Sequence, residues 1–242
     1  MDNKPIIALD FSTQKQVSQF LNLFSNEQLN LKVGMELFYQ EGPPIIYSLK
    51  EAGHDVFLDI KLHDIPTTVK KAMTGIARLG VDMINMHASG GKVMMEEARE
   101  GLEIGTAACA LRPRLLAVTQ LTSTSEDMLR DEQHCENNIE QSVLNYAKLA
   151  YDAQADGVVC SAHEADAIRK RLGSEFLRVT PGIRLDIKMK NDQQRVSTPG
   201  TAREMGATHI VTGRTITQSL NPVETYLEVL QQWKGEQLSY DQ

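Results

Sequence analysis

The sequence predicts an α/β protein that folds as a single (β/α)8 TIM barrel over residues 1–242. Eight short apolar segments alternate with eight amphipathic segments, and this alternation is typical of a parallel β/α protein. Eight such units favour a closed barrel over an open sheet, and many one-domain barrels have about this length. No Gly-x-Gly-x-x-Gly motif follows the first apolar segment, so the usual signature of a dinucleotide-binding fold is missing.

The predicted strands are short aliphatic runs, and the predicted helices are the segments between them in which apolar residues recur with helical spacing. Thr198-Pro199 before Thr201 and Asn221-Pro222 before the last helix are favourable helix starts, because a polar residue followed by proline favours the first turn. The strands are expected at Pro5–Leu9, Leu31–Val33, Val56–Ile60, Met83–Met86, Leu115–Val118, Gly157–Cys160, Leu177–Thr180 and His209–Thr212. The helices are expected at Thr13–Phe24, Pro44–Ala52, Thr67–Leu79, Gly91–Ile104, Val143–Ala153, Ala162–Leu172, Thr201–Met205 and Pro222–Trp233.

Charge and cysteine content argue against several classes of protein. The formal net charge of −7 disfavours a broad nucleic-acid surface, which would contact mainly phosphate groups, but it leaves room for a small anionic ligand. Cys109, Cys135 and Cys160 lack C-x-x-C spacing, so neither a disulfide framework nor a zinc site is predicted. The chain has no signal-peptide pattern and no apolar run long enough to span a bilayer. We therefore expect a cytoplasmic protein without a membrane partner.

The strongest indication of a functional site is the spacing D-x-K-x-x-D formed by Asp59, Lys61 and Asp64. Side chains alternate along a strand, so Asp59 and Lys61 should share one face of Val56–Ile60 and its aliphatic residues the other. Helices would cover the aliphatic face, which leaves the charged face toward the barrel interior. Buried charges are costly unless they pair or take part in chemistry. The triplet alone is equally compatible with a structural ion pair at a strand end.

Other polar residues are expected at the same rim of the barrel, where the carboxyl ends of parallel strands meet and where barrel enzymes carry their chemistry. Each has an ordinary structural explanation by itself; Asp10, for example, could cap the helix expected near Thr13. Their joint position at one rim favours a shared site. These residues are Asp10 after the first strand, Lys32 in the second, Thr122 after the fifth, Arg184 after the seventh, and Gly213 and Arg214 after the eighth.

The segment Ile210–Thr217 predicts an anion site. Gly213 allows close approach of the backbone to a ligand, and amides at a helix start can face a phosphate. Arg214 adds a guanidinium group that can donate two charge-assisted hydrogen bonds.

Two polar segments interrupt the strand–helix alternation. The first, Thr122–Asn138, is expected to be a loop with a helical piece. Arg184–Val196 is expected to be a lid or ligand loop, with a solvated surface loop as the alternative.

Four segments carry a resemblance to a known family. They are Leu58-Asp-Ile-Lys-Leu-His-Asp-Ile-Pro-Thr-Thr68, Leu116-Ala-Val-Thr-Gln-Leu-Thr-Ser123, Pro181-Gly-Ile-Arg184 and Asp192-Gln-Gln-Arg-Val-Ser-Thr-Pro199. With these segments, the chain closely resembles bacterial-type orotidine 5′-monophosphate decarboxylases over nearly its whole length. The resemblance implies decarboxylation of orotidine 5′-monophosphate to uridine 5′-monophosphate and carbon dioxide, the last step of de novo pyrimidine nucleotide synthesis. It also implies that no metal or organic cofactor is needed.

The resemblance further implies a homodimer with active sites at the subunit interface. An alternating array of Lys32, Asp59, Lys61 and Asp64 is expected there, with Asp64 supplied across the interface by the partner chain. The other residues are expected to contact separate parts of the substrate. Asp10 and Lys32 would contact the ribose, Thr122 the pyrimidine, Gln193, Gly213 and Arg214 the phosphate with Arg184 nearby, and Thr68 and Asp59 would also face the substrate.

Lys61 suits a decarboxylation that leaves a carbanion at C6 of the pyrimidine. A fixed ammonium would stabilise the developing charge and then deliver a proton, whereas arginine would hold its proton too tightly. Asp59 would lie near the departing carboxylate, where repulsion could raise the energy of the bound substrate. Asp59 and Asp64 would also keep Lys61 charged and oriented.

Two other functions fit parts of this pattern. One is a magnesium-dependent sugar-phosphate decarboxylase or aldolase of the same barrel group, which shares the D-x-K-x-x-D element; Ile65–Thr68 and Gln120–Ser123 favour the nucleotide enzyme. The other is a catalytically silent nucleotide-binding barrel, since a fold does not determine a function. Such a protein would be expected to lack Lys61 or one of its carboxylates, and all of them are present.

Overall fold

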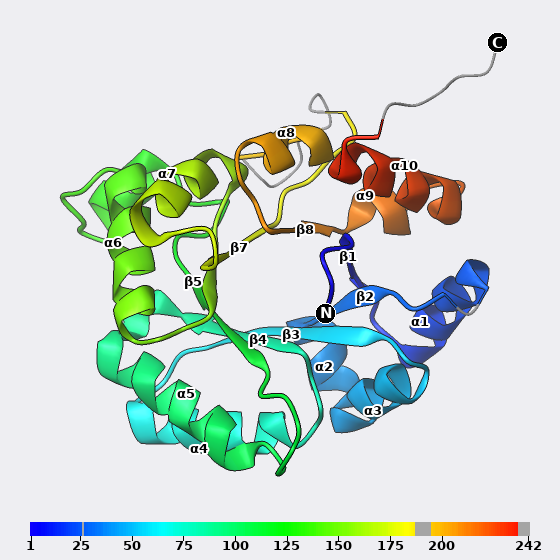
Figure 1. Cartoon of the computed structure of the whole chain (residues 1–242), viewed down its shortest axis with the longest axis horizontal. Coiled ribbons are helices and arrows are strands. Elements are labelled where there is room, and N and C mark those ends of the chain that lie inside the picture. Colours follow the sequence, from blue (N-terminus) through cyan, green and yellow to red (C-terminus); the bar gives the residue numbers. More distant parts are fainter. Residues whose placement is uncertain (26, 187–194, 237–242) are drawn as a thin grey trace.

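A computed structural model describes residues 1–25, 27–186 and 195–236. Eight parallel strands pair in chain order and β8 pairs with β1, which closes the barrel. Figure 1 shows the helices arranged around these strands. The strands are β1 (Ile6–Ala8), β2 (Asn30–Gly34), β3 (Asp55–Leu62), β4 (Met83–His87), β5 (Arg114–Val118), β6 (Gly157–Val159), β7 (Leu177–Thr180) and β8 (His209–Thr212). The predicted closed barrel and its eight strands are confirmed.

All eight predicted helices are present with slightly different ends, and two further short helices occur. The unpredicted α2 and α9 have seven and four residues, and unlike the six-residue α8 neither begins with a polar residue followed by proline. A π-helical turn, η3 (Met128–Glu132), lies within the loop expected at residues 122–138. The helices are α1 (Gln14–Leu21), α2 (Met35–Glu41), α3 (Pro43–Glu51), α4 (Pro66–Ala77), α5 (Lys92–Gly105), α6 (Ile139–Asp152), α7 (Ala162–Leu172), α8 (Pro199–Glu204), α9 (Arg214–Thr217) and α10 (Pro222–Lys234), with 3₁₀ turns η1 (Asn22–Phe24) and η2 (Ala88–Gly90).

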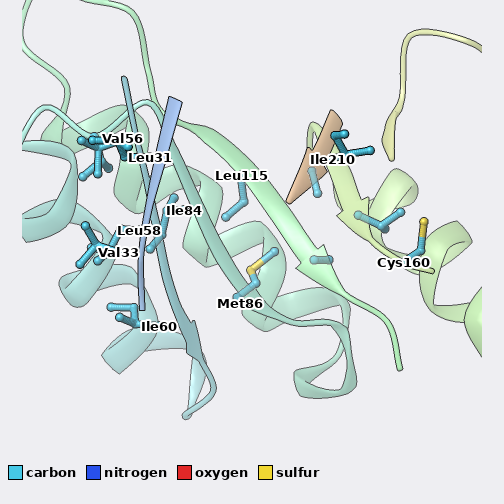
Figure 2. Close-up of a cluster of buried hydrophobic side chains, with 14 of the residues drawn as sticks. Leu31, Val33, Val56, Leu58, Ile60, Ile84, Met86, Leu115, Cys160 and Ile210 are labelled. Carbon is cyan, nitrogen blue, oxygen red and sulfur yellow. The ribbon is translucent and has the colours of Figure 1, made fainter. Parts of the chain in front are cut away.

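The alternation of side chains divides the apolar core into two layers. On β3, Val56, Leu58 and Ile60 belong to the larger layer between strands and helices, which confirms the predicted facing of that strand. Figure 2 shows these three side chains with neighbours from other strands. The smaller layer fills the barrel interior. Its buried members are Ile6, Ala8, Phe57, Met83, Leu116, Val179 and Val211.

None of the described helices is long and apolar enough to cross a membrane. The three cysteines form no disulfide, as expected. Residues 237–242 lie outside the described part of the chain, so the assignment of residues 1–242 to one domain stays a prediction.

Polar contacts close the barrel at the amino ends of its strands. The N-terminal ammonium lies 3.0 Å from Asp55, and the Asn30 side chain donates to the Asp2 carboxylate at 2.9 Å.

His209, at the start of β8, is buried at the same end of the barrel. Burial, followed by the positive charges of Arg114 and the N-terminus, lowers the pKa of His209 from 6.5 to about 4. The folded protein therefore keeps this imidazole neutral in mildly acidic solution.

This neutral imidazole should make stability depend on pH. Below pH 6.5 the unfolded chain binds a proton at His209 that the folded chain excludes until about pH 4, so stability falls as pH decreases through that window. As the pH falls from 6.5 to about 4, the wild-type protein should therefore lose about 3 kcal/mol more unfolding free energy than the His209→Gln variant loses. Urea unfolding across this pH range measures the difference. The exposed His163→Gln is the control, and equal pH slopes for the two variants would contradict the prediction.

Candidate active site

Eight of the residues predicted for a site line one cavity at the carboxyl ends of the strands. The cavity has a volume of about 210 Å³. Its walls come from segments that follow β1, β5, β7 and β8, and its floor includes side chains of β2, β3 and β4. The predicted residues that line it are Asp10, Lys32, Asp59, Lys61, Thr122, Arg184, Gly213 and Arg214.

Four charged side chains of alternating sign follow one another along the cavity floor. The Lys61 ammonium lies 2.6 Å from one oxygen of Asp59, and the Lys32 ammonium lies 3.2 Å from the other. Lys32 also lies 3.7 Å from Asp10. The Asp59 side chain is 13% exposed, whereas that of Asp10 is 52% exposed. The array therefore runs from the buried floor of the cavity toward solvent.

Asp59 is held ionised in the barrel interior. Burial by itself would raise its pKa, but the two lysine ammonium groups and hydrogen bonds from Lys61 and Asn85 outweigh burial. The net result is a pKa below the ordinary value for aspartate. A charged carboxylate at this position is stable because positive charges and donors surround it.

Lys61 reaches the cavity through an irregular backbone. Its φ is +49°, a left-handed conformation that costs a lysine about 1–2 kcal/mol. Between Leu58 and Leu62 the register with β4 shifts, so that β3 advances four residues while β4 advances two from Ile84 to Met86. Asp59 and Lys61 both line the cavity, although the pairing of β3 with β4 is irregular at Lys61.

Asn85 connects Asp59 and Lys61 of β3 and was missed in the sequence. Its side-chain nitrogen donates to Asp59 at 2.7 Å, and its oxygen accepts the backbone N–H of Lys61 at 2.8 Å. The residue is 1% exposed and lines the cavity. The sequence did contain a signal, because Asn85 is an amide in the middle of the apolar strand Met83–His87. Met83 faces the barrel interior, and side chains two residues apart on a strand share a face, so Asn85 faces the interior too.

Gly213, from the predicted anion segment, lies against Asp10. A Cβ atom on Gly213 would come within 2.9 Å of the Asp10 carboxylate, so a side chain would disturb the array. Asp10 does not cap the first helix: Thr13 accepts from the Gln16 backbone N–H and forms the cap, which makes the capping explanation of Asp10 wrong. The helix after Gly213 is the short α9.

Two predicted site residues, Asp64 and Thr68, lie outside the cavity of this chain. Asp64 and Thr68 are exposed at the start of α4, and one oxygen of Asp64 accepts the Ile65 backbone N–H at 2.6 Å. Gln193 and residues 187–194 as a whole lie outside the described residues, so most of the expected lid does too.

Comparison with known proteins accounts for this arrangement. The model of the family described as Orotidine 5′-phosphate decarboxylase / HUMPS matches residues 3–229. The chain belongs to this family. It is 58% identical over 233 residues to an orotidine 5′-phosphate decarboxylase of Listeria innocua, with 96% of this chain and 100% of the relative covered. It is 57% identical over 233 residues to the Staphylococcus aureus strain Newman protein of the same name, with 96% and 99% covered.

Solved structures agree with this family membership. Orotidine 5′-phosphate decarboxylase from Lactobacillus acidophilus superposes with a TM-score of 0.85 at 40% identity, covering 96% of this chain and 99% of that one. A crystal structure described as an uncharacterized conserved protein from Geobacillus kaustophilus gives a TM-score of 0.85 at 49% identity, with 94% and 99% covered. The family resemblance and the barrel fold predicted from the sequence are therefore confirmed.

Removing the Asn85 side chain should destabilise the protein. Asn85→Ala leaves the buried Asp59 carboxylate and the Lys61 N–H with one partner fewer each, which should cost about 1–3 kcal/mol of unfolding free energy. Urea unfolding followed by circular dichroism measures the loss. The control is Asn137→Ala at an exposed position, expected to change stability by less than about 0.5 kcal/mol. Equal effects of the two substitutions would refute the role given to Asn85.

Proposed function

We propose that this chain decarboxylates orotidine 5′-monophosphate to uridine 5′-monophosphate and carbon dioxide, as a step of pyrimidine nucleotide synthesis. The observation that carries the proposal is the Lys61 ammonium, held 2.6 Å from the ionised, buried Asp59 at the floor of the cavity. The names of relatives that are more than half identical to the chain support the same reaction. The family description also includes a group called HUMPS, but both of these relatives are named only as orotidine 5′-phosphate decarboxylases.

Lys61 is proposed as the group that makes the reaction possible. When the carboxylate leaves C6 of the pyrimidine, the electron pair of the broken bond stays on that carbon. A preorganised ammonium beside C6 stabilises this charge and then transfers a proton to it. Asp59 and Asn85 hold Lys61 from two sides, one at the ammonium and one at the backbone N–H. The ammonium is therefore oriented before substrate binds.

Asp59 is proposed to act both on the two neighbouring lysines and on the substrate carboxylate. Its carboxylate fixes the Lys32 and Lys61 ammonium groups. Beside the substrate carboxylate, it would also repel a charge that disappears when carbon dioxide leaves, which favours the transition state over the bound substrate.

The remaining cavity residues are proposed to bind the rest of the nucleotide. Asp10 and Lys32 would contact the ribose, and Thr122 the pyrimidine. Arg214, Gly213 and Arg184 would bind the phosphate at the opposite wall, where the two arginines supply charge-assisted donors. Gln193, from the segment outside the described residues, is proposed as a further phosphate contact on the family resemblance alone.

We also propose a homodimer in which Asp64 completes the partner's site. Asp64 and Thr68 are exposed at the rim rather than turned into the cavity of their own chain. Between them, the apolar Ile65 is 67% exposed, which suits a residue that another protein surface covers. Asp64 of one protomer would then extend the charge array of the other beyond Lys61. A cytoplasmic location and a reaction without metal or organic cofactor belong to the same proposal.

The direct test is incubation of the purified protein with orotidine 5′-monophosphate and a metal chelator, followed by ultraviolet absorbance and product analysis. Conversion to uridine 5′-monophosphate supports the proposal, including the absence of a metal. Turnover of a sugar phosphate only after magnesium is restored would assign the chain to the aldolase or decarboxylase alternative. Nucleotide binding without turnover would indicate a silent barrel.

Lys61→Ala should lower kcat by at least about a thousandfold, because the variant lacks both the stabilising charge and the proton donor. The exposed Lys71→Ala serves as the control and should keep wild-type kcat. Circular dichroism and sedimentation check that Lys61→Ala remains folded and keeps its assembly state. A folded Lys61→Ala protein with wild-type turnover would remove Lys61 from the mechanism.

Mixing two inactive variants should restore activity if Asp64 acts across an interface. Lys61→Ala and Asp64→Ala protomers, unfolded together and refolded as an equimolar mixture, would form heterodimers with one intact site. About a quarter of wild-type specific activity is then expected, because half of the dimers carry one working site of two. The activity of the mixture is compared with that of each variant refolded alone. No gain on mixing would argue against a shared site.

A further inference from the structure

Arg195 contacts two segments that are distant in the sequence. One guanidinium nitrogen pairs with the Glu164 carboxylate at the start of α7, and the other donates to the backbone oxygen of Leu121 at 2.8 Å. Both charged side chains are largely shielded, with Arg195 15% and Glu164 6% exposed. A shielded ion pair of this kind contributes mainly by holding a particular arrangement, since desolvation offsets much of its attraction.

The two ends of this contact are themselves held in place. The second oxygen of Glu164 accepts the Ser161 backbone N–H at 2.6 Å, so the carboxylate is fixed to the segment between β6 and α7. The Leu121 oxygen also accepts the Thr124 backbone N–H at 2.9 Å, which closes a turn over Leu121–Thr124. Thr122 lies inside that turn. The Arg195 guanidinium therefore binds the oxygen from which the turn carrying Thr122 begins.

The main chain near Arg195 is joined to a different wall of the cavity. Ser197, two residues further on, donates its N–H to Gly182 at 3.1 Å and accepts the N–H of Arg184 at 2.9 Å. Ile183 and Ser197 form a parallel bridge. Gly182 and Arg184 line the cavity on the side proposed to bind phosphate.

We propose that Arg195 is a positioning residue that holds the Leu121–Thr122 wall of the cavity at the correct distance from the Gly182–Arg184 wall. Its side chain holds the first wall, and its main chain two residues later belongs to the second. A nucleotide that contacts both walls at once depends on their spacing, whereas a ligand that contacts one wall does not. This inference rests on the proposed function, because that function assigns the base to one wall and the phosphate to the other.

The test compares two ligands that differ in the part that reaches Thr122. Uridine 5′-monophosphate spans both walls, and ribose 5-phosphate lacks the base. Arg195→Met removes the charge and the donors but keeps an apolar stem, and leaves the Ser197 backbone pairing intact. It should weaken uridine 5′-monophosphate binding about tenfold or more, as expected for the loss of charge-assisted hydrogen bonds, and change ribose 5-phosphate binding by less than about twofold. Titration calorimetry measures both affinities.

Two further variants make the comparison specific. The control is Arg171→Met, an exposed arginine on the same helix as Glu164, which should leave both affinities unchanged. Thr122→Ala tests the route of the effect: if Arg195 acts through the turn that carries Thr122, Arg195→Met should have a much smaller effect in that background. If Arg195→Met does not fold, Arg195→Lys decides the same comparison, because a single ammonium cannot bind Glu164 and Leu121 as the two nitrogens of the guanidinium do.

The outcomes separate this inference from the function on which it rests. Selective loss of uridine 5′-monophosphate affinity supports the positioning role. Equal changes for the two ligands, or none, would overturn it even if the wild-type protein decarboxylates orotidine 5′-monophosphate normally. Absence of turnover by the wild-type protein would instead overturn the proposed function, and this inference with it.

Discussion

The ionised carboxylate of Asp59 in the barrel interior is the constraint on which the site depends. A buried negative charge is tolerated only when positive charges and hydrogen-bond donors compensate for lost water. Lys32 and Lys61 supply the charges, and Asn85 adds a neutral donor. The same contacts that stabilise Asp59 also orient Lys61, so the electrostatic stability of the barrel interior and the geometry of the proposed reaction cannot be changed independently.

The barrel separates structural contacts from chemistry along its axis. At the amino ends of the strands, polar groups pair with one another around the N-terminus, and a neutral His209 adds to the packing. Apolar side chains fill the middle of the barrel. At the carboxyl ends, charges line an open cavity, and the backbone at Lys61 adopts a strained conformation. Strain of this kind persists because the hydrogen bond from the Lys61 N–H to Asn85 and the strand pairing that resumes at Leu62 hold the backbone in place.

Much of the fold followed from local rules. The eight strands and eight of the ten α-helices described were predicted, most of them because buried strands and amphipathic helices have distinct apolar spacing. The seven-residue α2 and the four-residue α9 were missed because they show little apolar spacing, whereas the six-residue α8 is preceded by the helix-start signal Thr198-Pro199. The site followed from topology, because parallel strands in a barrel bring their carboxyl ends to one rim. For this reason Asp10, Thr122 and Arg214 could be grouped although they are far apart in the sequence.

By itself, the sequence determined the barrel, the charged residues at its rim and the family to which the chain belongs. Only the tertiary structure decided how those charges are held. Asn85 meets Asp59 and Lys61 because β3 and β4 pair with Leu58 opposite Ile84, and no local pattern reports the register of two strands. Arg195 meets Leu121 because the segments after β5 and β7 converge at the rim. Contacts of this kind depend on distances between segments that are remote in the chain, whereas sequence patterns report mainly the environment of each segment alone.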